Sequence, residues 1–235
     1  MTLTGGHVMD QIRKISQGLK NDIDNPNDSS KPKILFVEGG SQYDIYAMRS
    51  AGIDPATGKE IFIKKNGEYT FKYDESERVA VGNTNPVLQG AWMNTVRYKG
   101  FSISIATSYT FGSDYYNSTL KNKVEDIDLE YNVDRRVFTD RWKQPGDHTR
   151  FLGIGTSSSS YQYSERFVEK RNELYISSIQ VMYDFTPKAI TRIGLRKLAI
   201  GFGLSDIAHI STVKFERGTS YPYCRGINLI FRPTF

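Results

Sequence analysis

The stretch Tyr223-Cys-Arg-Gly-Ile-Asn-Leu-Ile-Phe-Arg-Pro-Thr-Phe235 decides the fold class, because its side chains alternate in character from one residue to the next. Ile227, Leu229, Phe231 and Phe235 share one face, and mostly small or polar residues share the other. Successive side chains of a β-strand point to opposite faces, so the pattern predicts a strand between an apolar and a wet environment. Its aromatic last residue favours the closing strand of a transmembrane barrel over the frayed polar end of a soluble domain.

The middle of the chain predicts a hairpin with the same alternation. Residues 88–98 lead into Lys99-Gly100, and residues 101–111 return. The apolar face of the return strand carries Phe101, Ile103, Ile105, Tyr109 and Phe111, with Thr107 as its only polar member. Aromatic residues at both ends with aliphatic residues between them follow the order of depth in a bilayer. The opposite face is small and hydroxylated, as a water-filled lumen requires.

The lengths of the connections alternate along the chain. Short connections lie at Lys99-Gly100 and around Pro187, and long ones span residues 50–86, 114–171 and 205–222. Short turns on one side and long loops on the other are typical of outer-membrane barrels. We therefore expect an all-β fold, an antiparallel transmembrane β-barrel segment of about six or seven spanning strands with long extracellular loops.

Smaller elements are predicted between these strands. Thr2-Leu-Thr4 is typical of the end of a strand, and the spacing of apolar residues from Val8 to Leu19 predicts a short amphipathic helix. A hairpin is expected across Asn66-Gly67, which is a strong turn signal, and a helical stretch over residues 120–130.

Composition and spacing exclude several functions. The net charge of +5 is spread along the chain without a basic block, so we expect no nucleic-acid partner. His7, His148 and His209 lie far apart, so no metal site, catalytic triad or cofactor is expected. The carboxylates that could suggest sugar hydrolysis are interpreted as a solvated helix face: Glu125, Asp126, Asp128 and Glu130. The chain is therefore predicted not to be an enzyme.

A set of motifs runs nearly from end to end. In order, the chain contains Ala51-Gly-Ile-Asp-Pro-Ala-Thr-Gly-Lys-Glu60, Asn85-Pro86 with Tyr98-Lys-Gly-Phe-Ser102, Tyr115-Tyr-Asn-Ser118, Asp140-Arg-Trp-Lys-Gln-Pro-Gly146 and Ile210-Ser-Thr-Val-Lys-Phe-Glu-Arg-Gly-Thr-Ser-Tyr-Pro222. In order and spacing they resemble the SusC/RagA family of TonB-linked outer-membrane transporters of Bacteroidetes. Residues 1–235 resemble only the carboxy-terminal part of the 22-stranded barrel, because no signal peptide, TonB box or plug domain is found in them.

The resemblance implies a role in energised import of glycans or peptides across the outer membrane. It implies a SusD-like surface lipoprotein as the lid of the barrel, and TonB acting through the amino-terminal region that the motifs do not cover. The closing strand with Phe231 and Phe235 would be recognised by the barrel-assembly machinery, and outer-membrane lipid would surround the wall. Six or seven strands cannot close at the diameter of such a barrel, so the chain is expected to be inactive alone.

Binding residues are sought among rings near the loop ends. The candidates for stacking on a sugar or peptide are Tyr43, Tyr46, Tyr115, Tyr116 and Trp142. The alternative interpretation is that these rings belong to the aromatic girdle or pack within the loops. Arg135, Arg136 and Arg141 are either partners for acidic groups or solvated charges.

Two other functions stay open. A soluble β-sandwich that binds carbohydrate has the same alternation, with the face of Phe101, Ile103 and Ile105 as its core. A glycoside hydrolase domain needs a cleft with two positioned carboxylates. Ile103, Val181 and Leu229 distinguish the barrel from the sandwich, because in a sandwich they would meet across two stacked layers.

Overall fold

The computed structural model describes residues 1–17, 36–127, 130, 132–156, 162–186, 190, 194–214 and 225–234. Its main feature is an antiparallel sheet of six strands in the order β1-β7-β8-β9-β10-β11. The strands are β1 (Thr2–Gly6), β7 (Leu88–Tyr98), β8 (Phe101–Tyr116), β9 (Val168–Asp184), β10 (Lys197–Ser211) and β11 (Gly226–Thr234). We call this sheet the arm. Thr2-Leu-Thr4, predicted as the end of a strand, is confirmed as strand, but the described strand β1 begins there and continues to Gly6.

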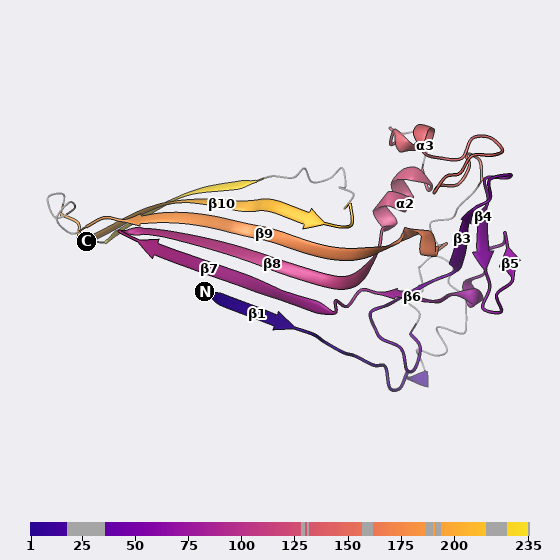
Figure 1. The fold of residues 1–235 in the computed structure, drawn as a ribbon, viewed down its shortest axis with the longest axis horizontal. Helices are drawn as coiled ribbons and strands as arrows, with labels where there is room; N and C mark the ends of the chain where they lie inside the picture. The colour runs from indigo at the N-terminus through magenta and orange to yellow at the C-terminus, as the bar shows by residue number, and fades with distance from the viewer. Residues whose placement is uncertain are drawn as a thin grey trace.

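A second body, which we call the head, lies at one end of the arm (Figure 1). Its strands are β2 (Asp44–Ala47), β3 (Arg49–Ile53), β4 (Glu60–Ile63), β5 (Tyr69–Thr70) and β6 (Val79–Asn83). Its helices are η1 (Glu75–Glu77), α2 (Ser118–Val124), α3 (Arg136–Thr139) and η2 (Glu165–Phe167). The hairpin predicted across Asn66-Gly67 is confirmed, because β4 pairs with β5.

The connections between the arm strands are short at one end of the arm and longer at the other, as the sequence predicts. The turn between β7 and β8, with Lys99 at φ 46° and Gly100 at φ 87°, and the connection from β9 to β10 lie at the end far from the head. Two consecutive residues with positive φ are the geometry of a type I′ hairpin turn, which glycine tolerates at its second position. We call this end of the arm the turn end. The described parts of the two longer segments, between β1 and β7 and between β8 and β9, build the head at the other end (Figure 1).

The register of the arm sorts its side chains into two faces. Ile103 lies opposite Val96 on one neighbouring strand and Val181 on the other. Phe202 lies opposite Val181 and Leu229. The other face carries Ser104 opposite Thr95 and Gln180, and Gly203 opposite Gln180 and Asn228. We call the apolar face the outer face and the small, polar face the inner face.

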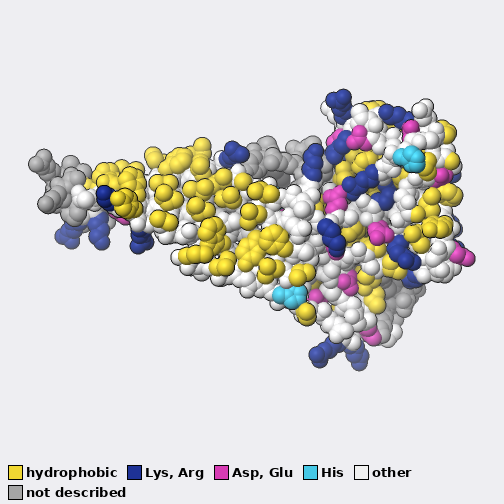
Figure 2. All heavy atoms as spheres, in the orientation of Figure 1, with side chains coloured by type: hydrophobic (Ala, Val, Ile, Leu, Met, Phe, Trp, Pro, Cys, Tyr) yellow, Lys and Arg dark blue, Asp and Glu magenta, His cyan; other side chains and the backbone are white. Residues whose placement is uncertain are grey.

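Most of the outer face is not covered by the described residues; at the turn end Ile190 and Leu195 form a buried cluster with Leu198. Ile103 is 42% exposed, Phe231 61% and Leu229 80%. Figure 2 shows hydrophobic side chains distributed along the length of the arm. Ile103 and Val181 are neighbours within one layer, and no second sheet of the described residues stacks on them. The alternative of a soluble β-sandwich is therefore wrong.

The long strands exceed the thickness of a bilayer. β8 has 16 residues, so at a rise of ~3.4 Å per residue it extends about 54 Å, or about 38 Å along the membrane normal at a tilt of 45°. The hydrocarbon core is about 30 Å thick. Strands of this length are long enough to cross such a core, and the end of β8 reaches the head. No helix among the described residues is long and apolar enough to cross a membrane.

Two local predictions differ from the structure. Residues 8–16 form no helix, because Ile12 exchanges backbone hydrogen bonds of 2.8 Å with Gly39 and Gly40 instead. These bonds to a distant segment satisfy groups that a helix would have paired locally. Of the remaining residues of the predicted helix, Gln17 is helical, and 18 and 19 lie outside the described residues, as does Phe235. The helical stretch predicted over residues 120–130 is α2, which begins earlier and ends at Val124.

Charge substitution distinguishes the two faces of β8. Ile105→Arg places a cation on the outer face near mid-membrane depth, and we expect it to lower the free energy of unfolding by about 2–4 kcal/mol. Ser104→Arg, one residue away on the inner face, is the matched control and should change little. Urea titration of the chain folded in lipid vesicles measures both. Equal destabilisation by the two variants would contradict the assignment of the faces.

Candidate functional site in the head

The head is held together by a small apolar cluster and a larger network of buried charges. The cluster consists of Leu120, Val124, Phe151 and Phe167, with Tyr116 packed against it. It joins α2 to η2 and to the segment around Phe151. Because this cluster is small, much of the specificity of the head depends on polar contacts.

Arg166 is the centre of the charge network. Its guanidinium lies 2.7 Å from a carboxylate oxygen of Glu60 and 2.9 Å from one of Glu125. Glu60 begins β4 and Glu125 follows α2, so one side chain joins three segments that are far apart in sequence. All three side chains are at most 7% exposed. Ser164 also donates a hydrogen bond to Glu60.

The electrostatics of this site keep Arg166 charged. Burial by itself lowers the pKa of Arg166, but hydrogen bonds and charge interactions with Glu60 and Glu125 outweigh it and raise the pKa. Charge-assisted hydrogen bonds of this kind are about twice as strong as neutral ones. Arg166 therefore keeps its proton near neutral pH, so its two ion pairs are not lost there by deprotonation of the guanidinium.

Two further buried cations, Arg141 and Lys121, extend the network. Arg141 donates hydrogen bonds of 2.7, 3.2 and 2.8 Å to the carbonyl oxygens of Leu152, Val124 and Gly153. Lys121 lies 2.6 Å from Asp126 in a pair whose side chains are 4% and 9% exposed. Burial lowers the pKa of Arg141, whereas the charges of Glu125 and Asp126 raise it. With Arg166, Arg141 and Lys121 against Glu60, Glu125 and Asp126, the network is neutral.

The interpretation of the acidic run as a solvated helix face is wrong for two of its members. Glu125 accepts a hydrogen bond from the backbone of Leu152 in addition to its contact with Arg166, and Asp126 pairs with Lys121. Glu130 is exposed, and Asp128 lies outside the described residues. Arg141 is buried, so solvation is also the wrong interpretation there.

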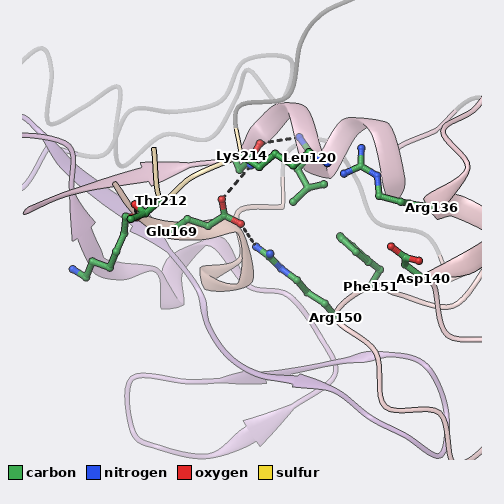
Figure 3. A pocket seen from close by; sticks show the side chains of 10 residues that line it. Leu120, Arg136, Asp140, Arg150, Phe151, Glu169, Thr212 and Lys214 are labelled. Atoms are coloured by element: carbon green, nitrogen blue, oxygen red, sulfur yellow. Dashed lines mark hydrogen bonds and ion pairs between the residues drawn. The ribbon is translucent and has the colours of Figure 1, made fainter. Parts of the chain in front are cut away.

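A cavity of about 540 Å³ lies where the head meets the arm (Figure 3). We call it the junction cavity. Its walls come from α2, the start of β9, the end of β10 and the segment of Phe151. The lining residues are Asn117, Leu120, Arg136, Asp140, Arg150, Phe151, Glu169, Lys170, Thr212 and Lys214.

The junction cavity is polar, and its lining carries four cations and two carboxylates. Arg150 is fixed 2.7 Å from Glu169, which also accepts a hydrogen bond from Asn117 (Figure 3). Lys170 lies 2.7 Å from Asp114, outside the lining. Arg136 is held by two hydrogen bonds to Asp134, and these together with their charge lower the pKa of Asp134. Such an arrangement offers fixed donors and acceptors to a polar ligand, and Asp114 and Asp134 outside the lining offset its two additional cations.

A second cavity of about 350 Å³ lies within the head and has aromatic walls, so we call it the aromatic cavity. It is lined by Lys59, Glu60, Phe62, Phe71, Tyr73, Leu152, Gly155, Thr156 and Gln162. Phe62 and Tyr73 meet edge to face with ring centroids 5.6 Å apart, and Phe71 is 56% exposed. Rings next to amide, hydroxyl and charged groups suit a sugar or a peptide side chain.

Trp142 and Tyr116 both take part in packing. The Trp142 indole donates a 2.9 Å hydrogen bond to the carbonyl of Pro55. Its ring lies so close to Gly58 that a Cβ there would stand 2.4 Å from it. Tyr116 lies 5.1 Å, ring to ring, from Tyr163 and packs against the apolar cluster. Trp142 thus fastens the motif of residues 51–60 to the segment 141–153.

The other three candidate rings lie elsewhere. Tyr43 is 41% exposed just before β2, Tyr46 lies half-buried within β2, and Tyr115 lies half-buried in β8. Burial and the charge of Asp44 raise the pKa of Tyr46. None of the five predicted rings lines either cavity. Their role in binding stays a prediction.

Sequence reasoning missed the residues that form the cavities and the network. Phe62, Phe71 and Tyr73 belong to short strands and turns in which nothing distinguishes a cavity wall from a solvent-facing ring. Glu60 and Arg166 are 106 residues apart, so no local pattern joins them. Among the described residues no group of histidine, cysteine, aspartate and glutamate could hold a metal ion.

The arm and the head together define a class of structure, a segment of antiparallel β-barrel wall with its loops folded at one end. No family model matches the sequence, and no curated protein matches it significantly. Solved structures with this fold were found.

The structures belong to the RagAB peptide importer and transporter. In its "open-open" state the TM-score is 0.63 at 17% identity, covering 75% of this chain and 20% of that chain. A structure of the RagAB peptide transporter gives 0.64 at 16%, covering 79% and 20%. The "closed-closed" state gives 0.61 at 17%, covering 75% and 20%. The chain therefore spans about a fifth of the length of those chains, and its fold agrees with the resemblance to the SusC/RagA family.

Removing the central cation tests the charge network. Arg166→Met leaves Glu60 and Glu125 buried without their cation, and we expect a loss of about 3–5 kcal/mol in the free energy of unfolding of the head. With Trp92→Phe as background, the fluorescence of Trp142 reports the head alone. Lys64→Met, which removes a pair with Glu68 on the surface, is the control and should have little effect. Similar midpoints for the two variants would show that the network does not hold the head.

Proposed function

We propose that residues 1–235 form part of the wall and the extracellular loops of a TonB-linked outer-membrane transporter that imports peptides or glycans. The observation that carries the proposal is the one-layer arm, with an outer face that the described residues leave uncovered except at the turn end. A soluble protein rarely exposes so large an apolar area. Acyl chains cover such a face without any further protein layer.

The two edges of the arm support a barrel. β1 pairs only with β7, and β11 pairs only with β10, so each has one edge without a strand partner among the described residues. An unpaired backbone group within the hydrocarbon core costs several kcal/mol. Further strands must therefore pair with β1 and β11 to complete the wall, and the chain alone should not transport.

The partners follow from the fold likeness and the sequence motifs. A SusD-like lipoprotein would cover the end of the barrel that carries the head. TonB would act through a part of the transporter other than this segment, and the barrel-assembly machinery would engage the strand with Phe231 and Phe235. Peptide is the cargo in the printed descriptions of the RagAB structures, and we extend it to this chain as a proposal.

The head supplies the surfaces for cargo or lid contacts. The aromatic cavity and the exposed ring of Tyr43 are the parts suited to stacking, and the junction cavity supplies fixed polar groups. Neither cavity shows a nucleophile beside a base or a metal site among the described residues, so we propose binding without catalysis.

Fractionation and transport assays test the proposal. We expect the expressed chain to remain with the outer membrane after alkaline carbonate extraction and to need detergent for solubility. Proteoliposomes that contain it alone should take up labelled peptide no faster than empty liposomes, because the wall is open. A monodisperse chain in detergent-free buffer, or uptake by the chain alone, would contradict the proposal.

A further inference from the structure

The carboxylate in the wall of the aromatic cavity already has its counter-charge. Glu60 lines the cavity, and its carboxylate lies 2.7 Å from the guanidinium of Arg166. Ser164 donates a further hydrogen bond to it, and the Glu60 side chain is only 6% exposed. Because the charge of Glu60 is neutralised within the network, it adds little attraction for a cation from solvent. This part of the wall therefore acts as a neutral polar surface.

Lys59 is the charge of the lining that has no counter-charge among the described residues. It precedes Glu60 at the start of β4, and it is exposed while it lines the cavity. None of the ion pairs between described residues includes its ammonium group. With Glu60 bound by Arg166, the cavity has one uncompensated positive charge at its opening.

Three rings form most of the apolar part of the lining. Phe62 is 4% exposed and meets Tyr73 edge to face, and the Tyr73 hydroxyl accepts a hydrogen bond from the backbone of Tyr163. These two rings are therefore fixed. Phe71 lines the same cavity and is 56% exposed, so much of its ring is open to solvent. Rings prefer the edges and faces of other rings, so this lining favours an aromatic ligand over an aliphatic one.

The cavity has room for a small ligand and is open to the outside of the head. Its volume of about 350 Å³ is near the lower end of the range for ligand pockets. Gly155 has no side chain, and a Cβ added there would meet no atom within 4 Å. The strand β4, which supplies Glu60 and Phe62, lies in the part of the head away from the arm (Figure 1). A ligand can therefore reach the cavity without passing along the arm.

We propose that the aromatic cavity binds a ligand in which an aromatic ring stands beside a carboxylate. The ring contacts Phe62, Phe71 and Tyr73, and the carboxylate pairs with Lys59. A neutral sugar can stack on the rings but makes no use of the positive charge, and an aliphatic acid uses the charge but not the rings.

Two sources present this chemistry. One is a free aromatic acid, and the other is the carboxy-terminal residue of a peptide that ends in phenylalanine or tyrosine. For the second source the inference rests on the proposed function, because it narrows the peptide cargo to chains with an aromatic end. The binding site itself lies within the head and does not depend on a closed barrel.

A calorimetric titration of the full chain in detergent tests the proposal, with the same micelles without protein as the blank. The probe is phenylpropionate. Phenylpropionamide lacks its charge, and cyclohexylpropionate lacks its aromatic ring. The test variants are Lys59→Gln and Phe71→Ala. The matched controls are Lys143→Gln and Phe138→Ala, at exposed positions outside the cavity lining, and Phe138 is 56% exposed, as Phe71 is. Circular dichroism confirms that each variant is folded.

We expect the wild type to bind phenylpropionate about fivefold more tightly than either the amide or the cyclohexyl acid. Lys59→Gln should abolish the preference for the acid over the amide. Phe71→Ala should weaken the binding of phenylpropionate about fivefold, and both controls should match the wild type. Equal binding of the acid and the amide by the wild type would overturn the proposal. So would a preference for the acid that survives Lys59→Gln, or equal binding of the phenyl and cyclohexyl acids.

A tripeptide distinguishes the two sources. If glycylglycylphenylalanine binds, and both amidation of its end and Lys59→Gln abolish the binding, the ligand is the end of a peptide. If phenylpropionate binds and the tripeptide does not, the ligand is a free aromatic acid, and the proposed chemistry still holds. If neither binds, the proposal is wrong. Failure of the proposed function has a separate sign, which is a wild-type chain that needs no detergent, whatever it binds.

Discussion

A sheet one layer thick with an uncovered apolar face is the constraint on which the rest of the structure depends. Protein sheets bury an apolar face against helices, against a second sheet or against lipid. The described part of this chain offers the arm neither a helix layer nor a sheet layer, and Leu229 on β11 is 80% exposed. Lipid meets the requirement, and with lipid as the solvent the small inner face, the long strands and the two free edges all become features of one wall.

The head follows a different principle, because in the proposed transporter it would be stable in water while the arm beside it faces lipid. Its apolar cluster is small. Arg166 binds Glu125, which is 41 residues away in the sequence, and Glu60, which is 106 residues away. Buried pairs of this kind contribute more to the choice of one arrangement than to total stability. That suits a region in which two cavities require defined walls.

The sequence predicted the arm well and the head poorly, for a physical reason. Alternation is a local signal with a period of two residues. It therefore predicted that Phe101, Ile103 and Ile105 share one face without any information about the neighbouring strands. Glu125 has no such signal, because its burial depends on Arg166 and on the backbone of Leu152, both distant in sequence. The helix predicted over residues 8–16 is wrong for the opposite reason. The local spacing favoured a helix, but backbone hydrogen bonds of Ile12 to the distant Gly39 and Gly40 replaced it.

The contact between the outer face and lipid is the central claim, and accessibility along β8 tests it most directly. Single nitroxide labels at each position from Phe101 to Ala106, in the chain reconstituted in vesicles, are exposed to oxygen, which concentrates in lipid, and to a polar nickel complex, which stays in water. We predict a period of two residues, with oxygen favoured at 101, 103 and 105 and nickel at 102, 104 and 106. Low access of both reagents to the odd positions would mean that protein covers them, and would contradict the account.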